Sequence, residues 1–221
     1  LSNNKIIICG KTKEKLHEVK KTYPEIAIFQ CDISDEEQCF NLAKWIKENH
    51  SDLNVLINNA AIVHISQFMD DDDIITKGEL EMKTNFFGPL RLIKLLSPII
   101  ESNNNPTLIN ITTGLVYIPR ADYPFYNSTK SALHSFTQTL RIQLSKTNFK
   151  IIEVMFPAVN TPWHKGSPPK IAISSETAVR EMVKGLSSGK TEIKVAKVKL
   201  LYLLSRIAPN FALKKINNLA K

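Results

Sequence analysis

Residues 108–156 read LINITTGLVYIPRADYPFYNSTKSALHSFTQTLRIQLSKTNFKIIEVMF. This stretch begins and ends with short apolar runs, Leu108–Ile111 and Ile151–Phe156. Between them, five apolar side chains recur at helical spacing and form one stripe: Phe125, Leu133, Phe136, Leu140 and Leu144. Strands that are apolar on both faces and joined by an amphipathic helix are typical of a parallel sheet covered by helices. The stretch therefore predicts a β-α-β unit.

The same alternation extends along the chain in both directions. Further apolar runs are Lys5–Cys9, Ile26–Cys31, Val55–Ile57 and Ile193–Val195. Amphipathic helices are expected between them, one opened by a capping box of Ser34 and Glu37, and one long helix that is kinked at Gly88-Pro89. With no internal repeat and no linker, we expect residues 1–221 to form one α/β domain, a doubly wound parallel sheet of the Rossmann type.

Composition excludes several classes of protein. The chain has 221 residues, of which 43% are hydrophobic and 23% charged, so it is neither disordered, collagen-like nor a bare coiled coil. No apolar run approaches the ~20 residues that cross a bilayer, and no secretion signal is apparent. The net charge of +8 comes from dispersed lysines, which predicts no nucleic-acid partner. Three cysteines and five histidines without ligand spacing favour a reducing cytoplasm and no metal site.

The strongest chemical signal is Tyr126-Asn-Ser-Thr-Lys130. Residues four apart in a helix share a face, and this face is offset from the apolar stripe. An ammonium beside a phenol favours the phenolate and lowers the phenol pKa from its usual value of about 10. The motif predicts a tyrosine that exchanges a proton near neutral pH. A surface Tyr–Lys pair without catalytic role is the alternative.

Polar or small residues also close the predicted strands, where open parallel sheets gather their active sites. Thr113 ends one strand 13 residues before Tyr126, where its hydroxyl could hold a substrate oxygen. Asn85 lies inside an apolar helix, next to the Gly88-Pro89 kink that would free backbone groups to bind water; an amide satisfied by backbone is the alternative. Three more strands end in Asn58-Asn-Ala-Ala61, Cys31-Asp-Ile33 and Pro157-Ala-Val-Asn-Thr161.

Together these motifs resemble the short-chain dehydrogenase/reductase family, and within it the DltE-like oxidoreductases, through Cys9-Gly-Lys11, Thr112-Thr-Gly-Leu115 and Ala132-Leu-His-Ser-Phe136. The resemblance spans nearly the whole chain and implies nicotinamide-dependent interconversion of a small-molecule carbonyl and alcohol. The implied catalytic residues are Asn85, Thr113, Tyr126 and Lys130, with Tyr126 as general acid/base. The implied cofactor contacts are Asp32 and Ile33 at the adenine, Asn59 and Ala60 at the ribose, Lys130 at the nicotinamide ribose, and Val159 and Thr161 at the carboxamide.

Three departures from the family pattern stand out. Thr113 replaces the usual serine, which restricts the hydroxyl and predicts weakened catalysis. Ala61 and Ala158 replace glycines and crowd two turns on the cofactor side. At the cofactor's 2′ position, Lys11 and Lys13 occur without an acid, which favours NADP over NAD, unless these lysines merely begin a solvated helix.

The family's first strand, its T-G-x-x-x-G-I-G turn and its first helix have no counterpart in the sequence, so we expect an N-terminally truncated chain. The only Gly-x-x-x-Gly, Gly185 to Gly189, follows a helical stretch and cannot be the phosphate-binding turn. The missing strand would be central, so two strands should keep unpaired inner edges.

Three functions follow from these observations. The leading hypothesis is an NADP-preferring reductase, and its rival is a truncated, inactive remnant that acts only by association. A third is membrane-surface binding by Leu200–Ile216, for which packing over the substrate cleft or a subunit interface is preferred. The segment Pro162–Leu186 is expected to cover the cleft, with Trp163 and His164 near its mouth. The family habit of pairing through two long helices implies a homodimer or homotetramer.

Overall fold

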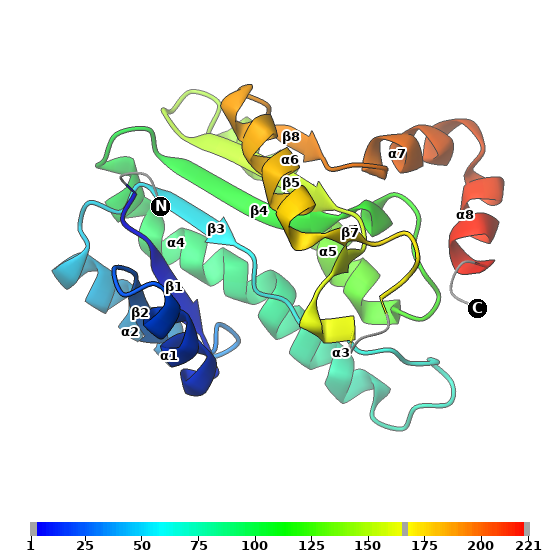
Figure 1. Ribbon diagram of the computed structural model, residues 1–221, viewed down its shortest axis with the longest axis horizontal. Coiled ribbons are helices and arrows are strands. Elements are labelled where there is room, and N and C mark those ends of the chain that lie inside the picture. Colours follow the sequence, from blue (N-terminus) through cyan, green and yellow to red (C-terminus); the bar gives the residue numbers. More distant parts are fainter. Residues whose placement is uncertain (1–3, 165–167, 219–221) are drawn as a thin grey trace.

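The computed structural model of the protein describes residues 4–164 and 168–218. Within them strands and helices alternate along the chain, as the apolar runs predicted (Figure 1). The strands are β1 (Ile7–Gly10), β2 (Ala27–Gln30), β3 (Val55–Asn58), β4 (Thr107–Thr113), β5 (Lys150–Phe156), β6 (Val159–Asn160), β7 (Ile173–Ser174) and β8 (Glu192–Lys194). The helices are α1 (Lys13–Thr22), α2 (Glu36–Asn49), α3 (Ile74–Met82), α4 (Gly88–Glu101), α5 (Pro124–Gln143), α6 (Ser175–Ser187), α7 (Val198–Ile207) and α8 (Pro209–Asn218).

The strands form two separate parallel sheets and one short parallel pair. The larger sheet has the order β3-β4-β5-β8, β1 pairs with β2, and β6 pairs with β7. The longest pairing joins β4 to β5, from Thr107 opposite Lys150 to Thr113 opposite Phe156. The predicted α/β class is confirmed. Among the described residues β1 and β3 each pair on one side only, as expected for two inner edges, and Ile57 of β3 is 48% exposed.

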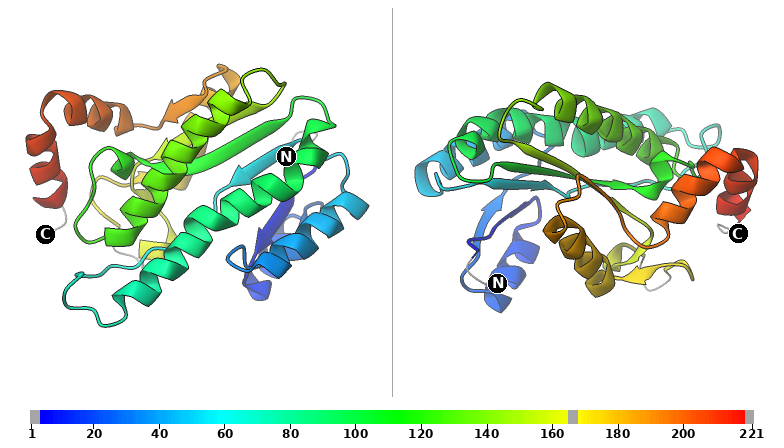
Figure 2. Two further views of the ribbon diagram at one scale, coloured as in Figure 1. Left: turned by 180° about the vertical axis from the view of Figure 1, so that it is seen from behind. Right: turned by 90° about the horizontal axis from the view of Figure 1, so that it is seen from above.

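Helices cover both faces of the larger sheet (Figure 2). The long helices α4 and α5 lie side by side on one face, and α6 lies on the other. Two apolar clusters follow from this layering. One joins α2 and α4 to the strands through Leu42, Leu96 and Leu108, and the other places Val154 and Ile193 beneath α6. The helices α7 and α8 extend past the end of the sheet (Figure 1).

The start of α2 differs from the predicted capping box. Asp35, not Ser34, is the N-cap residue, and its carboxylate accepts a hydrogen bond from the Gln38 N–H at 3.0 Å. The Ser34 hydroxyl instead donates to Asp32 at 2.7 Å. Ser34 and Asp35 are both suitable N-cap residues, but the Ser34 hydroxyl is already bonded to Asp32. The cap nevertheless begins a helix where one was expected.

The predicted long helix is continuous, but it contains an irregular turn. Between α3 and α4, Lys83–Phe87 form a π-helical turn, which is wider than an α-helical turn and often occurs at functional sites. Asn85 lies within it. Gly88 follows, and a Cβ there would lie 2.8 Å from the Ile33 carbonyl oxygen, so only glycine lets the start of α4 approach the end of β2 this closely.

Candidate active site

Four predicted residues meet around the carboxyl end of β4. Thr113 is its last residue, Tyr126 and Lys130 lie in the first turns of α5, and Asn85 faces α5 from the π-helical turn. Thr113, Tyr126 and Lys130 line one cavity of about 650 Å³. Asn85 is fully buried beside it. The four residues are therefore brought together as predicted, although only three of them border the cavity.

The ammonium of Lys130 is buried, with 2% of the residue exposed. It donates to the Ile111 carbonyl oxygen at 2.9 Å and lies 5.9 Å from the centre of the Tyr126 ring. Burial lowers the pKa of Lys130 to about 8, because the charged form loses its hydration. The sequence had predicted a face turned away from the helix's core contact. That prediction is wrong for Lys130, because β4 supplies the carbonyl that holds the side chain inside.

The phenol of Tyr126 does not show the predicted low pKa. Burial first, and then the negative charge of Glu81 and the neighbouring Tyr123, raise its pKa to about 12. The Tyr126 ring packs edge-on against Tyr123, with 6.1 Å between the ring centres. The expected lowering by the lysine is overturned because desolvation outweighs an ammonium that is itself directed at a backbone carbonyl.

Thr113 and Asn85 are held by local geometry. The Thr113 side-chain oxygen accepts a hydrogen bond from the Leu115 N–H at 3.3 Å, so it also begins the short turn after β4. Asn85 accepts from the Ile62 N–H and donates to the Ile62 carbonyl, both at 2.8 Å. Its amide also donates to the Thr129 hydroxyl at 3.2 Å. This is the backbone-satisfied amide that the sequence left open as an alternative, and a role beside a water stays a prediction.

The predicted cofactor residues fall into two groups. Asn59, Val159 and Thr161 line the same cavity as Tyr126 and Lys130. The remaining residues, Lys11, Asp32, Ile33 and Ala60, do not line it and lie at the carboxyl ends of β1, β2 and β3. Lys11 is exposed, and its ammonium lies 4.0 Å from the Asp32 carboxylate. The cation expected at the 2′ position therefore has an acid beside it, which the sequence separation of these residues had hidden.

Two polar features near the cavity were missed by sequence reasoning. Glu81 on α3 is 1% exposed and accepts from the His64 N–H at 2.7 Å, while His64 Nδ1 lies 2.9 Å from the same oxygen. Its other oxygen is buried and has no hydrogen-bond partner within the described ranges. Burial raises the pKa of Glu81, and the bonds from His64 oppose that rise. Sequence analysis could have identified Glu81, because it is an acidic residue one helical turn before Asn85 in an otherwise apolar helix.

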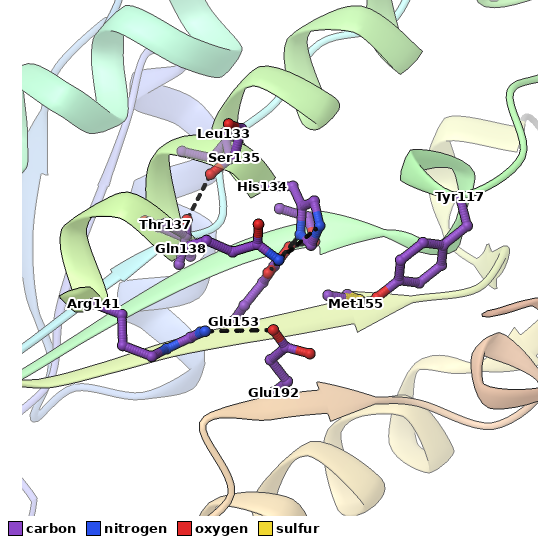
Figure 3. Close-up of polar contacts among 12 residues, drawn as sticks. Tyr117, Leu133, His134, Ser135, Thr137, Gln138, Arg141, Glu153, Met155 and Glu192 are labelled. Atoms are coloured by element: carbon purple, nitrogen blue, oxygen red, sulfur yellow. Dashed lines mark hydrogen bonds and ion pairs between the residues drawn. The ribbon is translucent and has the colours of Figure 1, made fainter. Parts of the chain in front are cut away.

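The second missed feature is a buried network behind Thr113. Glu153 on β5 is fully buried, accepts from the Thr112 hydroxyl at 2.5 Å and lies 2.8 Å from His134 Nδ1 (Figure 3). His134 comes from α5, one turn after Lys130, and points toward Glu153 in Figure 3. Glu153 is 19 residues from His134 in the sequence, so spacing along the chain gave no sign of this carboxyl partner.

The other predictions about the surroundings have mixed outcomes. His164 lines the cavity, as expected for a residue near its mouth, while the Trp163 side chain and residues 165–167 lie outside the described part of the chain. Gly189 follows the C-cap residue of α6 with φ of 70°, so the Gly185–Gly189 spacing does belong to a helix end. Within 4–164 and 168–218, no helix is long and apolar enough to span a membrane.

Comparison with known proteins adds independent information. Residues 2–172 match the family described as short chain dehydrogenase. An uncharacterised oxidoreductase, DltE of Bacillus subtilis, is 37% identical over 196 residues, which cover 86% of this chain and 77% of the relative. A fatty acyl-CoA reductase of Acinetobacter baylyi is 28% identical over 161 residues, covering 71% of this chain and 55% of that protein.

Solved structures show the same fold. A short-chain dehydrogenase of Burkholderia cenocepacia, in complex with NADP, aligns with a TM-score of 0.82 and 23% identity over 96% of this chain and 85% of that one. One from Burkholderia phymatum, in complex with NAD, aligns with a TM-score of 0.81 and 14% identity, covering 93% and 84%. At these identities the likeness concerns the fold alone.

Proposed function

The chain belongs to the short-chain dehydrogenase/reductase family of oxidoreductases, and on that premise we propose that it reduces a small-molecule carbonyl compound to an alcohol, with Tyr126 as the general acid. The observation that carries this proposal is the convergence of Thr113, Tyr126 and Lys130 on the wall of one cavity. Three residues from a strand end and two helical turns supply a hydroxyl, a phenol and an ammonium to the same space.

The proton moves from the phenol to the substrate oxygen. With its pKa raised to about 12, Tyr126 remains protonated at neutral pH and is ready to donate. The Thr113 hydroxyl can donate a hydrogen bond to the same substrate oxygen and orient it, because it stands at the end of β4 beside the cavity. Lys130 holds the Ile111 carbonyl of β4 and so fixes the start of α5 against the strand that carries Thr113.

The residues present fit the nicotinamide end of a dinucleotide. Asn59, Val159 and Thr161 border the cavity that Tyr126 also borders, so polar side chains and backbone from three segments face one space. When bound, NADP(H) would supply the hydride. We propose that Lys130 and these three residues hold its nicotinamide half, and that Asp32, Ile33, Ala60 and the exposed Lys11 hold its adenosine half. The proposed preference for NADP rests on Lys11, whose ammonium also lies 4.0 Å from the Asp32 carboxylate.

We further propose that the protein self-associates and acts in the cytoplasm. The π-helical turn before α4 exposes Phe87 and α5 exposes Ile142, at 45% and 75%, which supports self-association as a homodimer or homotetramer. The cytoplasmic location rests on Cys9, Cys31 and Cys39, which are free thiols as expected in a reducing compartment.

The decisive experiment is the oxidation of NADPH by the purified protein with a panel of ketones and aldehydes. Turnover that Tyr126→Phe reduces by at least about a hundredfold is expected, since removing a general acid typically costs this much. Tyr23→Phe is the matched control, because Tyr23 is exposed at the end of α1. Absence of turnover with every compound, or equal rates in Tyr126→Phe, would overturn the proposal and favour a protein that acts only by association.

A further inference from the structure

The cavity that holds the catalytic hydroxyls has an extended apolar wall. Leu115, Phe156 and Ile171 border it from the body of the domain, and Leu201, Leu204 and Ile216 border it from α7 and α8. A volume of about 650 Å³ lies within the range of small-molecule sites. Such walls stabilise a ligand through buried apolar area, at about 25 cal/mol per Å². Small, fully polar carbonyl compounds would leave these walls without contacts.

The charges that border this cavity all have one sign. Arg120, Lys130, Lys197 and Lys215 line it, and no aspartate or glutamate is among its described lining residues. Lys130 belongs to the catalytic group. Lys197 and Lys215 are exposed at the rim, and neither forms an ion pair within the ranges that the structure describes. The cavity therefore combines an apolar interior with a cationic margin.

Arg120 carries an unused hydrogen-bond donor at this margin. One end of its guanidinium binds the Asp122 carboxylate at 2.7 Å, and the group lies 4.6 Å from the centre of the Tyr123 ring. Its Nε is buried and has no hydrogen-bond partner within residues 4–164 and 168–218. A buried N–H without an acceptor is costly, and a shift of the Arg120 side chain that brings its guanidinium to a ligand oxygen in the cavity would remove that cost. Tyr123 in turn packs against Tyr126, which places this donor near the proposed chemistry.

The cationic margin is built by contacts between distant segments. Asn217 of α8 accepts from the Ala121 N–H at 2.7 Å and donates to the Pro119 carbonyl at 3.1 Å. These two bonds fasten α8 to the loop that carries Arg120. Lys215 and Ile216 precede Asn217 on the same helix and line the cavity. Arg120 and Lys215 both line the cavity, one from the loop and the other from the helix that these bonds hold together.

We propose that the substrate is an amphipathic carbonyl compound, with an aliphatic chain along the apolar wall and an anionic end group bound by Arg120 and Lys215. This inference rests on the proposed reductase function and names its substrate class. Charge-assisted hydrogen bonds to an anion are the stronger ones, and arginine and lysine both provide them. The aliphatic chain accounts for the wall formed by α7 and α8, and the anion accounts for the one-signed margin.

The test compares three probes: a medium-chain ω-oxo fatty acid, its methyl ester and the matching unsubstituted aldehyde. The acid is expected to have a kcat/KM at least about tenfold above the ester, since a hydrogen bond to a charged group is worth roughly that factor. Lys215→Gln should reduce this ratio severalfold, and Arg120→Gln should reduce it further. Lys214→Gln is the matched control. It removes the same charge at the neighbouring position of α8, and the Lys214 side chain does not line the cavity.

Calorimetric binding of the simple fatty acid, against the corresponding alcohol, gives a readout that does not depend on catalysis. Tighter binding of the acid, weakened by Lys215→Gln and not by Lys214→Gln, supports the anion site in the cavity. If no probe is then turned over, the reductase proposal falls and the bound acid is a ligand and not a substrate. Equal kcat/KM for acid and ester in the active protein, or equal binding of acid and alcohol, overturns the inference and leaves the reductase proposal standing.

Discussion

The ammonium of Lys130 donates to the Ile111 carbonyl oxygen at 2.9 Å, and lies 5.9 Å from the centre of the Tyr126 ring. The lysine is thus bound to the strand and not to the phenol. Burial then acts on both side chains in the same way, favouring the neutral form of each. The pKa of Lys130 falls to about 8 and that of Tyr126 rises to about 12.

Lys130 should make the folded protein more stable at alkaline pH. Its pKa in the folded state, about 8, lies below the ordinary 10.5, so the unfolded chain binds more protons between these values. Stability must therefore rise with pH across this interval, by up to roughly 3 kcal/mol from this group alone. Urea unfolding at neutral pH and near pH 10 should show the rise in the parent protein and its loss in Lys130→Met. Lys146→Met, at an exposed loop position, should keep the rise. A parent curve that runs parallel to the Lys130→Met curve would contradict the assignment.

Tyr126 should make the two reaction directions differ in their pH dependence. Carbonyl reduction needs the protonated phenol, which a pKa of about 12 maintains through neutral and mildly alkaline pH, so its rate should stay level. Alcohol oxidation needs the phenolate, so its rate should climb about tenfold per pH unit below that pKa. Initial rates in both directions between neutral and strongly alkaline pH measure this. An oxidation rate that is already level near pH 7 would show that the phenol is acidic after all.

Glu81→Gln should move the oxidation profile to lower pH. The charge of Glu81 is one of the causes that raise the Tyr126 pKa, and an amide removes the charge while its oxygen can still accept from the His64 N–H. A shift of half a pKa unit would change the phenolate fraction about threefold. Rates at a fixed alkaline pH, with Glu79→Gln on the exposed face of α3 as control, test this. An unchanged or upward shift would exclude Glu81 as a contributor.

Gly78→Ala should damage the site through packing. A Cβ at Gly78 would lie 2.5 Å from the Phe125 ring, so that ring must move, and Phe125 immediately precedes Tyr126. Overpacking costs roughly 1–3 kcal/mol, of which a better helix propensity returns at most about 1. We expect lower stability and lower kcat. Gly189→Ala, where φ is 70° and the added Cβ would meet nothing within 4 Å, should cost stability but not kcat. Full stability and rate in Gly78→Ala would show that the α3–α5 contact adapts freely.

His134→Leu should destabilise the protein more than Glu153→Gln. Without His134, the fully buried Glu153 carboxyl keeps the Thr112 hydroxyl as its remaining hydrogen-bond partner (Figure 3). Leaving a buried acceptor without one of its partners costs about 1–3 kcal/mol, whereas an amide at position 153 keeps groups that can pair with both neighbours. Urea unfolding of both variants, and of the exposed-site control His17→Leu, provides the comparison. A cost of His134→Leu no greater than that of the control would contradict the network.

Local sequence patterns predicted most of the strands and helices and the positions of Thr113, Tyr126 and Lys130. Apolar runs located the strands of the two sheets, and helical spacing located the long helices α4 and α5, because these periodicities depend on residues that are near neighbours in sequence. The helix α6 was predicted only as a helical stretch before Gly185, and most of it lies within the segment Pro162–Leu186 that was expected to cover the cleft. The placement of Thr113 at a strand end and of Tyr126 and Lys130 on one helix followed for the same reason. The N-cap of α2 was predicted one residue too early, at Ser34 instead of Asp35, because either side chain can accept a hydrogen bond from a backbone N–H.

The pKa values, the partners of Asn85 and Glu81, and the cationic margin of Arg120 and Lys215 were beyond the reach of spacing. Each depends on segments far apart in the chain: the Ile111 carbonyl against Lys130, the His64 N–H against Glu81, and Asn217 against the loop at Arg120. Desolvation and Coulomb interaction depend on everything that surrounds a group in space. The sequence therefore determines which residues lie on the same helix face or strand end. The protonation state of each side chain depends on the tertiary structure, because distant segments bury it and supply the neighbouring charges.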